Sequence, residues 1–363
     1  MEKTITLEKP KERQSNFELL RILAMGMITI YHCVLYSGVF DIGANTDAKL
    51  LANFLYPFGK VGVGCFILLM GYFMVNSKFR TEKLLKIILE TMFYSFGLLM
   101  VWMLRMGYTL DLVENKLIYI MPTVHYTYWF VSAYVFRYLI SPLLNCILKN
   151  FSIDKLKKVV IIGLIVICVP YCIFGTRWVA TDITYFVLLY LIGGYLKLSN
   201  YEFKRKNSSI IMILVNLFLI TAIMIVSIIL NKKFNLEIDV LRFGYEYSIF
   251  VIMLSIGIFL FFKNLKIKNN KIINFIAKCS FAVYLFSDHP MHKKLMWNID
   301  FKTKEYIFKP FYIFGFRIIT ALILIYLVVI VIDTLRRELL EKNIFKIKII
   351  KKACLKLDDY INN

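Results

Sequence analysis

The chain has 363 residues, of which 59% are hydrophobic and 16% aromatic, and its formal net charge is +21. This composition leaves too little polar surface for a soluble globular protein of this length, so that class is excluded. The excess of basic residues would suit nucleic acid by charge alone, but the basic residues gather in short stretches between apolar blocks. That distribution favours a membrane protein with no nucleic-acid partner.

Ten apolar blocks follow one another along the chain, and a helix needs about 20 apolar residues to cross a bilayer. The blocks are 17–37, 58–76, 84–104, 127–148, 157–174, 182–197, 209–230, 244–262, 273–289 and 311–333. The sixth and the ninth are short or polar, which leaves the count open by one. The sequence predicts an all-α polytopic membrane protein with about ten transmembrane helices in one bundle.

Basic residues are unevenly distributed between alternate connecting stretches. If the N-terminus lies in the cytoplasm, each inward stretch carries about four Lys or Arg residues, whereas the outward stretches are poorer except for 290–310. This is the positive-inside pattern, and it predicts that both termini are cytoplasmic. It also predicts contacts with anionic lipid headgroups. We divide the chain into a cytoplasmic N-terminal segment (1–16), a transmembrane domain (17–333) and a basic cytoplasmic tail (334–363).

The first block, NFELLRILAMGMITIYHC (16–33), has ionisable residues on both sides of its apolar run. Arg21 and His32 are eleven positions apart, so a helix places them on one face, about 16 Å apart along the axis. Glu18 lies one turn before Arg21 and can pair with it. Ionisable groups at membrane depth usually face a cavity or a partner, so we expect both residues to face one interior groove. An interfacial Arg21 and a hydrogen-bonded packing role for His32 remain open alternatives.

Further polar residues stand inside or beside the blocks. Arg137 falls near the middle of the fourth block, where it either serves the site or pairs with an interior carboxylate such as Glu90. Lys60 lies near the outer end of the second block and is a candidate for contact with a substrate. The spacing of Cys and His residues predicts neither a disulfide framework nor a metal site.

Several segments resemble, in the same order along the chain, acyltransferase family 3, the integral-membrane O-acyltransferases of bacterial surface polysaccharides. They are the first block with ten residues between Arg21 and His32, FGKVGVGCFILLMGYF (58–73), YWFVSAYVFRYLISPLLN (128–145), YLIGGYL (190–196) and SFAVYLFSDHP (280–290). Two positions depart from the family pattern. Met70 stands where a Ser is common, and Ser287 stands where many relatives have the His of a Tyr-Leu-Ile-His motif.

The resemblance implies that an acyl group, usually acetyl, passes from cytoplasmic acyl-CoA to a hydroxyl of a cell-surface or lipid-linked glycan. It implies a multi-pass protein of the bacterial plasma membrane, with acetyl-CoA as a substrate and no tightly bound cofactor or metal. The chain either completes the transfer itself or passes the acyl group to a separate extracytoplasmic partner.

The resemblance also implies roles for particular residues. His32 is the catalytic residue, either as the base that takes the proton of the hydroxyl or as a transient acyl carrier, and Arg21 acts with it. We expect the remaining candidates to lie around His32 and Arg21. They are Glu18 and Arg137 in support, Lys78 and Arg80 on the donor side, and Lys60 and Trp129 on the acceptor side.

Two other classes of multi-spanning protein compete with the acyltransferase. A polysaccharide exporter or flippase would favour matching spans broken by Gly or Pro in the two halves of the chain, and none is evident. A glycan polymerase subunit would favour outward loops with several arginines, whereas Arg105, Arg177 and Arg242 are scattered one to a loop.

Overall fold

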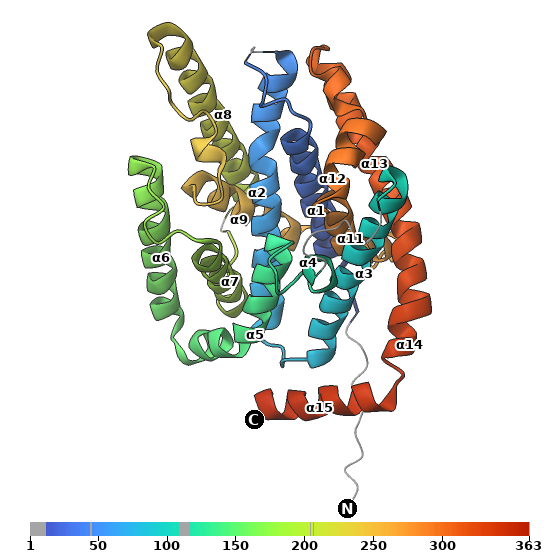
Figure 1. The fold of residues 1–363 in the computed structure, drawn as a ribbon. Coiled ribbons are helices and arrows are strands. Elements are labelled where there is room, and N and C mark those ends of the chain that lie inside the picture. The colour runs from blue at the N-terminus through green and yellow to red at the C-terminus, as the bar shows by residue number, and fades with distance from the viewer. Residues whose placement is uncertain (1–11, 44–45, 109–116, 204, 206, 363) are drawn as a thin grey trace, which may run out of the picture.

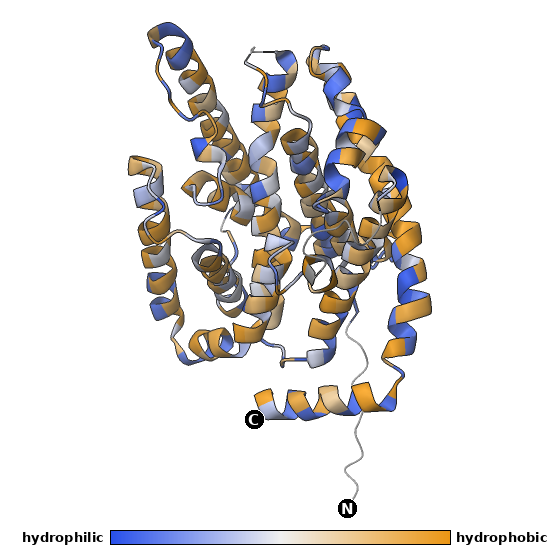
Figure 2. Ribbon diagram, viewed as in Figure 1, coloured by the Kyte–Doolittle hydropathy of each residue, from blue (hydrophilic) through white to orange (hydrophobic). Residues whose placement is uncertain are grey.

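A computed structural model describes residues 12–43, 46–108, 117–203, 205 and 207–362. The regular elements in these ranges are all helices, and the long ones run side by side in one bundle (Figure 1). Figure 2 shows that apolar residues dominate the long helices. The predicted all-α class is therefore confirmed.

The long helices come in the following order. They are α1 (Ser15–Tyr36), α2 (Asp47–Met74), α3 (Thr81–Met106), α5 (Trp129–Asn150), α6 (Ile153–Phe174), α7 (Asp182–Leu198), α8 (Ser208–Phe234), α9 (Ile249–Asn264) and α13 (Phe311–Arg336). The shorter helices are α4 (Leu117–Ile120), η2 (Arg242–Gly244), α10 (Lys271–Lys278), α11 (Ser280–Ser287), α12 (His292–Leu295), η3 (Met296–Asp300), η4 (Thr303–Tyr306), η5 (Arg337–Glu341), α14 (Lys342–Ile344) and α15 (Lys348–Asn362).

Eight helices of the described ranges are long and apolar enough to cross a membrane. Each of the ten predicted blocks falls mainly on a helix. The sixth falls on α7, which has 17 residues, and the ninth on α10 and α11, which have eight residues each and are separated at Cys279. The membrane architecture is confirmed, while the count of ten spans and the cytoplasmic termini stay predictions.

Hydrogen bonds to side chains fix the beginnings of four of the long helices, α2, α6, α7 and α9. Thr181 and Thr184 form a reciprocal capping box at the start of α7, and the side chain of Thr46 accepts a hydrogen bond from the Lys49 amide at the start of α2. Such caps satisfy amide groups that have no partner within the helix. They also explain why α7 begins at the residue where the apolar block begins.

Helix α2 packs against α1, α7 and α9 near the middle of the bundle (Figure 1). Two glycines allow the close approach. A β-carbon at Gly62 would collide with the carbonyl oxygen of Ala24 in α1, and one at Gly71 would collide with the carbonyl oxygen of Tyr190 in α7. Small residues commonly allow transmembrane helices to pack backbone to backbone. This contact holds the polar face of α1 towards the interior.

Helix α15 lies across the ends of the bundle helices at one side of the molecule (Figure 1). Asp358 accepts hydrogen bonds from the amide and the hydroxyl of Thr81, and Asn362 bonds the backbone of Phe79. The tail is thereby fixed to the connection between α2 and α3.

We expect Gly71→Leu to destabilise the bundle, because the new side chain meets backbone that cannot yield without separating α2 from α7. Overpacking of this kind costs about 1–3 kcal/mol or more. Gly97→Leu is the matched control, since nothing lies within 4 Å of a β-carbon at Gly97. Thermal unfolding of both variants in detergent measures the difference, and equal midpoints would contradict the packing argument.

Candidate active site

Two cavities are lined by residues of α1. The histidine cavity, of about 160 Å³, is lined by His32, Tyr31, Lys60, Trp129, Asp288, Lys293 and further residues. The arginine cavity, of about 230 Å³, is lined by Arg21, Met70, Glu90, Tyr134, Lys278, Phe281 and further residues. The predicted residues His32, Lys60 and Trp129 thus come together, whereas Arg21 lies in the other cavity.

Aromatic rings separate the two cavities. Phe130 lines the arginine cavity and Tyr284 lines the histidine cavity, and their ring centroids are 5.4 Å apart. Both side chains are almost completely buried. The single groove expected for Arg21 and His32 is therefore divided into two. The face of α1 could not reveal this, because the dividing rings come from α5 and α11.

His32 is held by a serine at the end of α11. The residue is 3% exposed, and its Nδ1 lies 2.9 Å from the hydroxyl oxygen of Ser287. The Ser287 hydroxyl also lies 3.2 Å from the carbonyl oxygen of Tyr284, to which it can donate. The donor in the His32–Ser287 contact depends on the tautomer of His32: when Ser287 donates to Tyr284, Nδ1 of His32 carries the proton and Nε2 keeps its lone pair.

A buried carboxylate stands next to this serine in the chain. Asp288 accepts hydrogen bonds from the hydroxyls of Tyr36 at 2.6 Å and Tyr284 at 3.2 Å. The Lys293 ammonium donates to Tyr36 Oη at 2.9 Å and lies 3.3 Å from Asp288 Oδ1. His32 packs against the rings of Tyr36 and Tyr284. The imidazole therefore lies beside two tyrosines that donate to Asp288, and Asp288 in turn forms an ion pair with Lys293.

Most residues that surround His32 do not stand out in the sequence. Ser287 marks only a departure from the family pattern, and the expected site includes neither Asp288 nor Tyr36 nor Lys293. The rule that ionisable residues at membrane depth deserve attention would have found Asp288, which lies within the ninth apolar block. No sequence pattern places Tyr36 or Lys293 beside it, because that contact joins the end of α1 to the segment after α11.

The predicted acceptor-side residues lie together on another wall of the histidine cavity. The Lys60 ammonium pairs with the Glu246 carboxylate at 3.0 Å. It also lies over the rings of Tyr31 and Trp129, at 5.3 and 5.7 Å from their centroids. Glu246 comes from the short segment between η2 and α9. This wall therefore combines a largely buried ion pair with two aromatic faces.

On the arginine side, the expected pairing within α1 is present. Arg21 contacts the buried carboxylate of Glu18 at 2.5 Å, and Arg13 contacts the other oxygen at 3.4 Å. Arg21 also lies near the ring of Phe73, at 5.8 Å from its centroid. Glu18 thus holds the position of Arg21 at the edge of the cavity.

Arg137 occupies an unusual environment. It is 1% exposed, its Nε lies 3.1 Å from the sulfur of Met70, and its guanidinium stacks over Phe186 and Tyr134 at 4.6 and 5.4 Å. Neither terminal nitrogen has a hydrogen-bond partner in the part of the chain that the structure describes. The predicted alternative of a pair with Glu90 is wrong.

Glu90 lines the arginine cavity, but its partner comes from α13. Its carboxylate pairs with Arg336 at 3.2 Å, and Arg336 also contacts Asp333 and Glu341. The pairing of Glu90 with Arg336 depends on the contact between α3 and the end of α13, which are far apart in the sequence. The spacing within the fourth block could not show it.

Lys78 and Arg80 lie outside both cavities. They belong to the connection between α2 and α3, where both side chains are exposed and Arg80 contacts Glu82 at 3.4 Å. The structure therefore does not bring them to His32.

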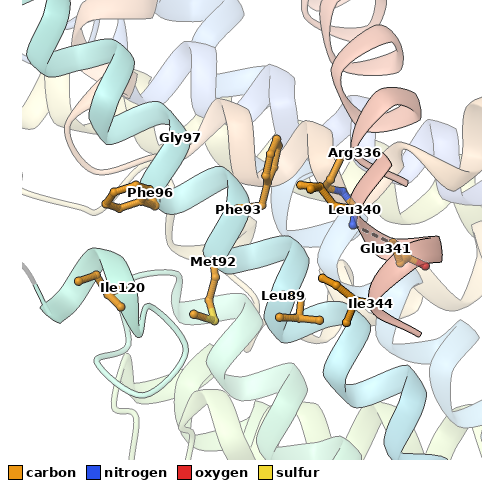
Figure 3. A pocket seen from close by; sticks show the side chains of 10 residues that line it. All are labelled: Leu89, Met92, Phe93, Phe96, Gly97, Ile120, Arg336, Leu340, Glu341 and Ile344. Carbon is orange, nitrogen blue, oxygen red and sulfur yellow. Dashed lines mark hydrogen bonds and ion pairs between the residues drawn. The ribbon is translucent and has the colours of Figure 1, made fainter. Parts of the chain in front are cut away.

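A larger cavity of about 540 Å³ lies between α3 and the end of α13 (Figure 3). Apolar side chains such as Phe93, Phe96 and Leu340 line most of it. Arg336 and Glu341 reach its edge, but they are paired with each other at 3.0 Å. This cavity offers no base or nucleophile, so the histidine cavity is the candidate active site.

We expect Glu246→Gln to destabilise the protein by about 3 kcal/mol or more, because it leaves the largely buried Lys60 ammonium without its counter-ion. The double variant Lys60→Met with Glu246→Gln should recover part of the loss. Thermal unfolding in detergent measures both. Glu305→Gln removes an exposed partner of Lys302 and is the control with little effect. A double variant as unstable as the single one would contradict the pairing argument.

Comparison with known proteins gives one finding. No curated protein and no solved structure matches the chain significantly. Residues 14–334 match the family model of acyltransferase family 3, which is described as an acyltransferase domain. Because this match covers most of the chain, the protein belongs to acyltransferase family 3 and is a membrane acyltransferase.

Proposed function

We propose that the protein transfers an acyl group, most simply acetyl, from cytoplasmic acyl-CoA to a hydroxyl of a cell-surface or lipid-linked glycan at the bacterial plasma membrane. The observation that carries the proposal is the environment of His32. Its Nδ1 is held by Ser287, and a buried carboxylate stands nearby. This arrangement suits a general base more than a packing residue.

In the proposed reaction, Nε2 of His32 removes the proton of the acceptor hydroxyl as its oxygen attacks the thioester carbonyl. Such proton transfer contributes about 10²–10⁴-fold to a rate. The Asp288 carboxylate offsets the positive charge of the resulting imidazolium, and Ser287 keeps the ring in the required tautomer. An acyl group carried on His32 would use the same nitrogen and is the alternative course.

The histidine cavity supports an acceptor the size of one sugar ring. Its volume is about 160 Å³, and Tyr31, Tyr36 and Trp129 give it aromatic walls. Aromatic faces suit the apolar faces of a sugar, and a few polar groups at the rim fix its orientation. Lys60 is placed to supply such a group on the acceptor side.

The arginine cavity supports the donor. Arg21 and Lys278 line it, and Arg137 reaches its wall through Tyr134 and Met70. Guanidinium groups bind phosphates well, and the uncompensated charge of Arg137 would be stabilised by an anion of CoA. If Arg21 faces the cytoplasm, the donor enters there. Lys78 and Arg80 would then attract it to the surface rather than bind it in the cavity.

The competing interpretations receive less support. Family membership gives no reason to favour an exporter or a polymerase subunit. A separate extracytoplasmic partner is also unnecessary, because the histidine cavity contains both a candidate base and space for an acceptor. We therefore favour direct transfer by this chain.

We expect His32→Ala to reduce O-acetylation of the surface polysaccharide by about a hundredfold or more, because the base is lost. Proton NMR of isolated polysaccharide from cells with the wild type, no gene or the variant measures the acetyl content. His125→Ala, which removes an exposed loop histidine, is the control. Unchanged acetylation in the His32 variant would rule out its role. Loss of the polymer itself in the deletion would favour the exporter or polymerase.

We expect Ser287→Ala to lower the turnover number about tenfold, because the imidazole loses one hydrogen bond that orients it. The KM for acetyl-CoA should stay unchanged, since Ser287 does not line the arginine cavity. Membranes supplied with radiolabelled acetyl-CoA and isolated polysaccharide give both constants. Ser227→Ala, at a buried serine of α8, is the control. A variant with a normal turnover number would show that the serine does not orient the base.

A further inference from the structure

Lys293 is placed differently from the other cation of the histidine cavity. Its ammonium lies over the ring of Tyr36 at 4.3 Å and contacts Tyr36 Oη and Asp288. These contacts use two of its three N–H groups, and no described residue accepts the third. Its side chain is 23% exposed and lines the cavity that His32 also lines. A donor therefore remains available to whatever occupies the cavity.

The proposed reaction requires a donor of this kind. When the hydroxyl attacks the thioester, the carbonyl oxygen becomes negatively charged, and a site within a membrane must stabilise that charge itself. Asp288 repels it, and the Tyr36 proton is directed to Asp288. Lys60 is engaged by Glu246 and two aromatic faces on the other wall.

We propose that Lys293 is the oxyanion-stabilising residue of the acyl transfer, an assignment that rests on the proposed function. Its free N–H donates to the carbonyl oxygen of the thioester as that oxygen gains charge. Tyr36 and Asp288 are positioning residues that hold the ammonium in place. Because the carboxylate is shared with two tyrosine hydroxyls, it offsets only part of the charge of Lys293.

The step balances without a further reactant. The hydroxyl oxygen bonds to the carbonyl carbon, its proton passes to Nε2 of His32, and the carbonyl electron pair moves onto oxygen. When that pair returns, the carbon–sulfur bond breaks, and the thiolate takes the proton from the imidazolium. The products are the ester and free CoA. Lys293 keeps all its protons throughout, so its role is electrostatic.

The test compares Lys293→Met, Lys293→Gln and Lys293→Arg in membranes supplied with radiolabelled acetyl-CoA and isolated polysaccharide. We expect the two neutral variants to lower the turnover number about 10²–10³-fold, as loss of an oxyanion donor does. The KM values for donor and acceptor should stay within about twofold, because the charge develops only after binding. Lys293→Arg should recover at least part of the loss. Lys294→Met, which removes the exposed neighbouring cation, should behave as the wild type.

The remaining outcomes separate this assignment from the proposed function. If the wild type transfers acetyl, His32→Ala does not, and either neutral Lys293 variant keeps a normal turnover number, the assignment alone is overturned. A loss confined to the acceptor KM also overturns it, because Lys293 would then only bind substrate. If the wild type transfers no acetyl, the proposed function fails as well. Thermal unfolding measures whether the two neutral variants fold. If Lys293→Met does not fold, Lys293→Gln still provides the test.

Discussion

A charged side chain inside a bilayer needs a partner, and this requirement organises the polar interior of the protein. Glu246 forms an ion pair with Lys60, Asp288 with Lys293, and Glu90 with Arg336. The pairs of Lys60 and of Arg336 join segments that are far apart in the chain and so help to fix how the helices meet. The pair of Asp288 and Lys293 spans the end of α11. Lys60, Asp288 and Lys293 line the cavity that contains His32.

Against that background, the environment of Arg137 is the exception. It is 1% exposed, yet aromatic faces and a thioether surround it in place of a carboxylate. Cation–π contacts with Phe186 and Tyr134 offset part of the desolvation cost, but they do not neutralise the charge. Under the proposed function, an anion of the donor in the arginine cavity would act on Arg137 across Met70 and Tyr134 and offset part of that charge.

The sequence predicted the helical class and the approximate bounds of the long helices because these features depend on local patterns, whereas the catalytic role of His32 stays a prediction. Apolar length defines the spans, and helical periodicity places Glu18, Arg21 and His32 on one face. The same reasoning failed for Glu90, whose partner comes from α13. It also missed the neighbours of His32, because a contact between the ends of α1 and α11 leaves no periodic signature in either segment.

The division into two cavities has a mechanistic consequence under the proposed function. A donor bound beside Arg21 and an acceptor bound beside His32 are separated by the contact between Phe130 and Tyr284. Only the slender acyl-bearing arm of the donor has to pass these rings, while the phosphates remain near the arginines. Both rings are buried, so under the proposed function the thioester would meet His32 in a largely dry site. In such a site the charges of Asp288 and Lys293 act at close range with little screening, and small displacements of α11 would change the rate more than the affinity.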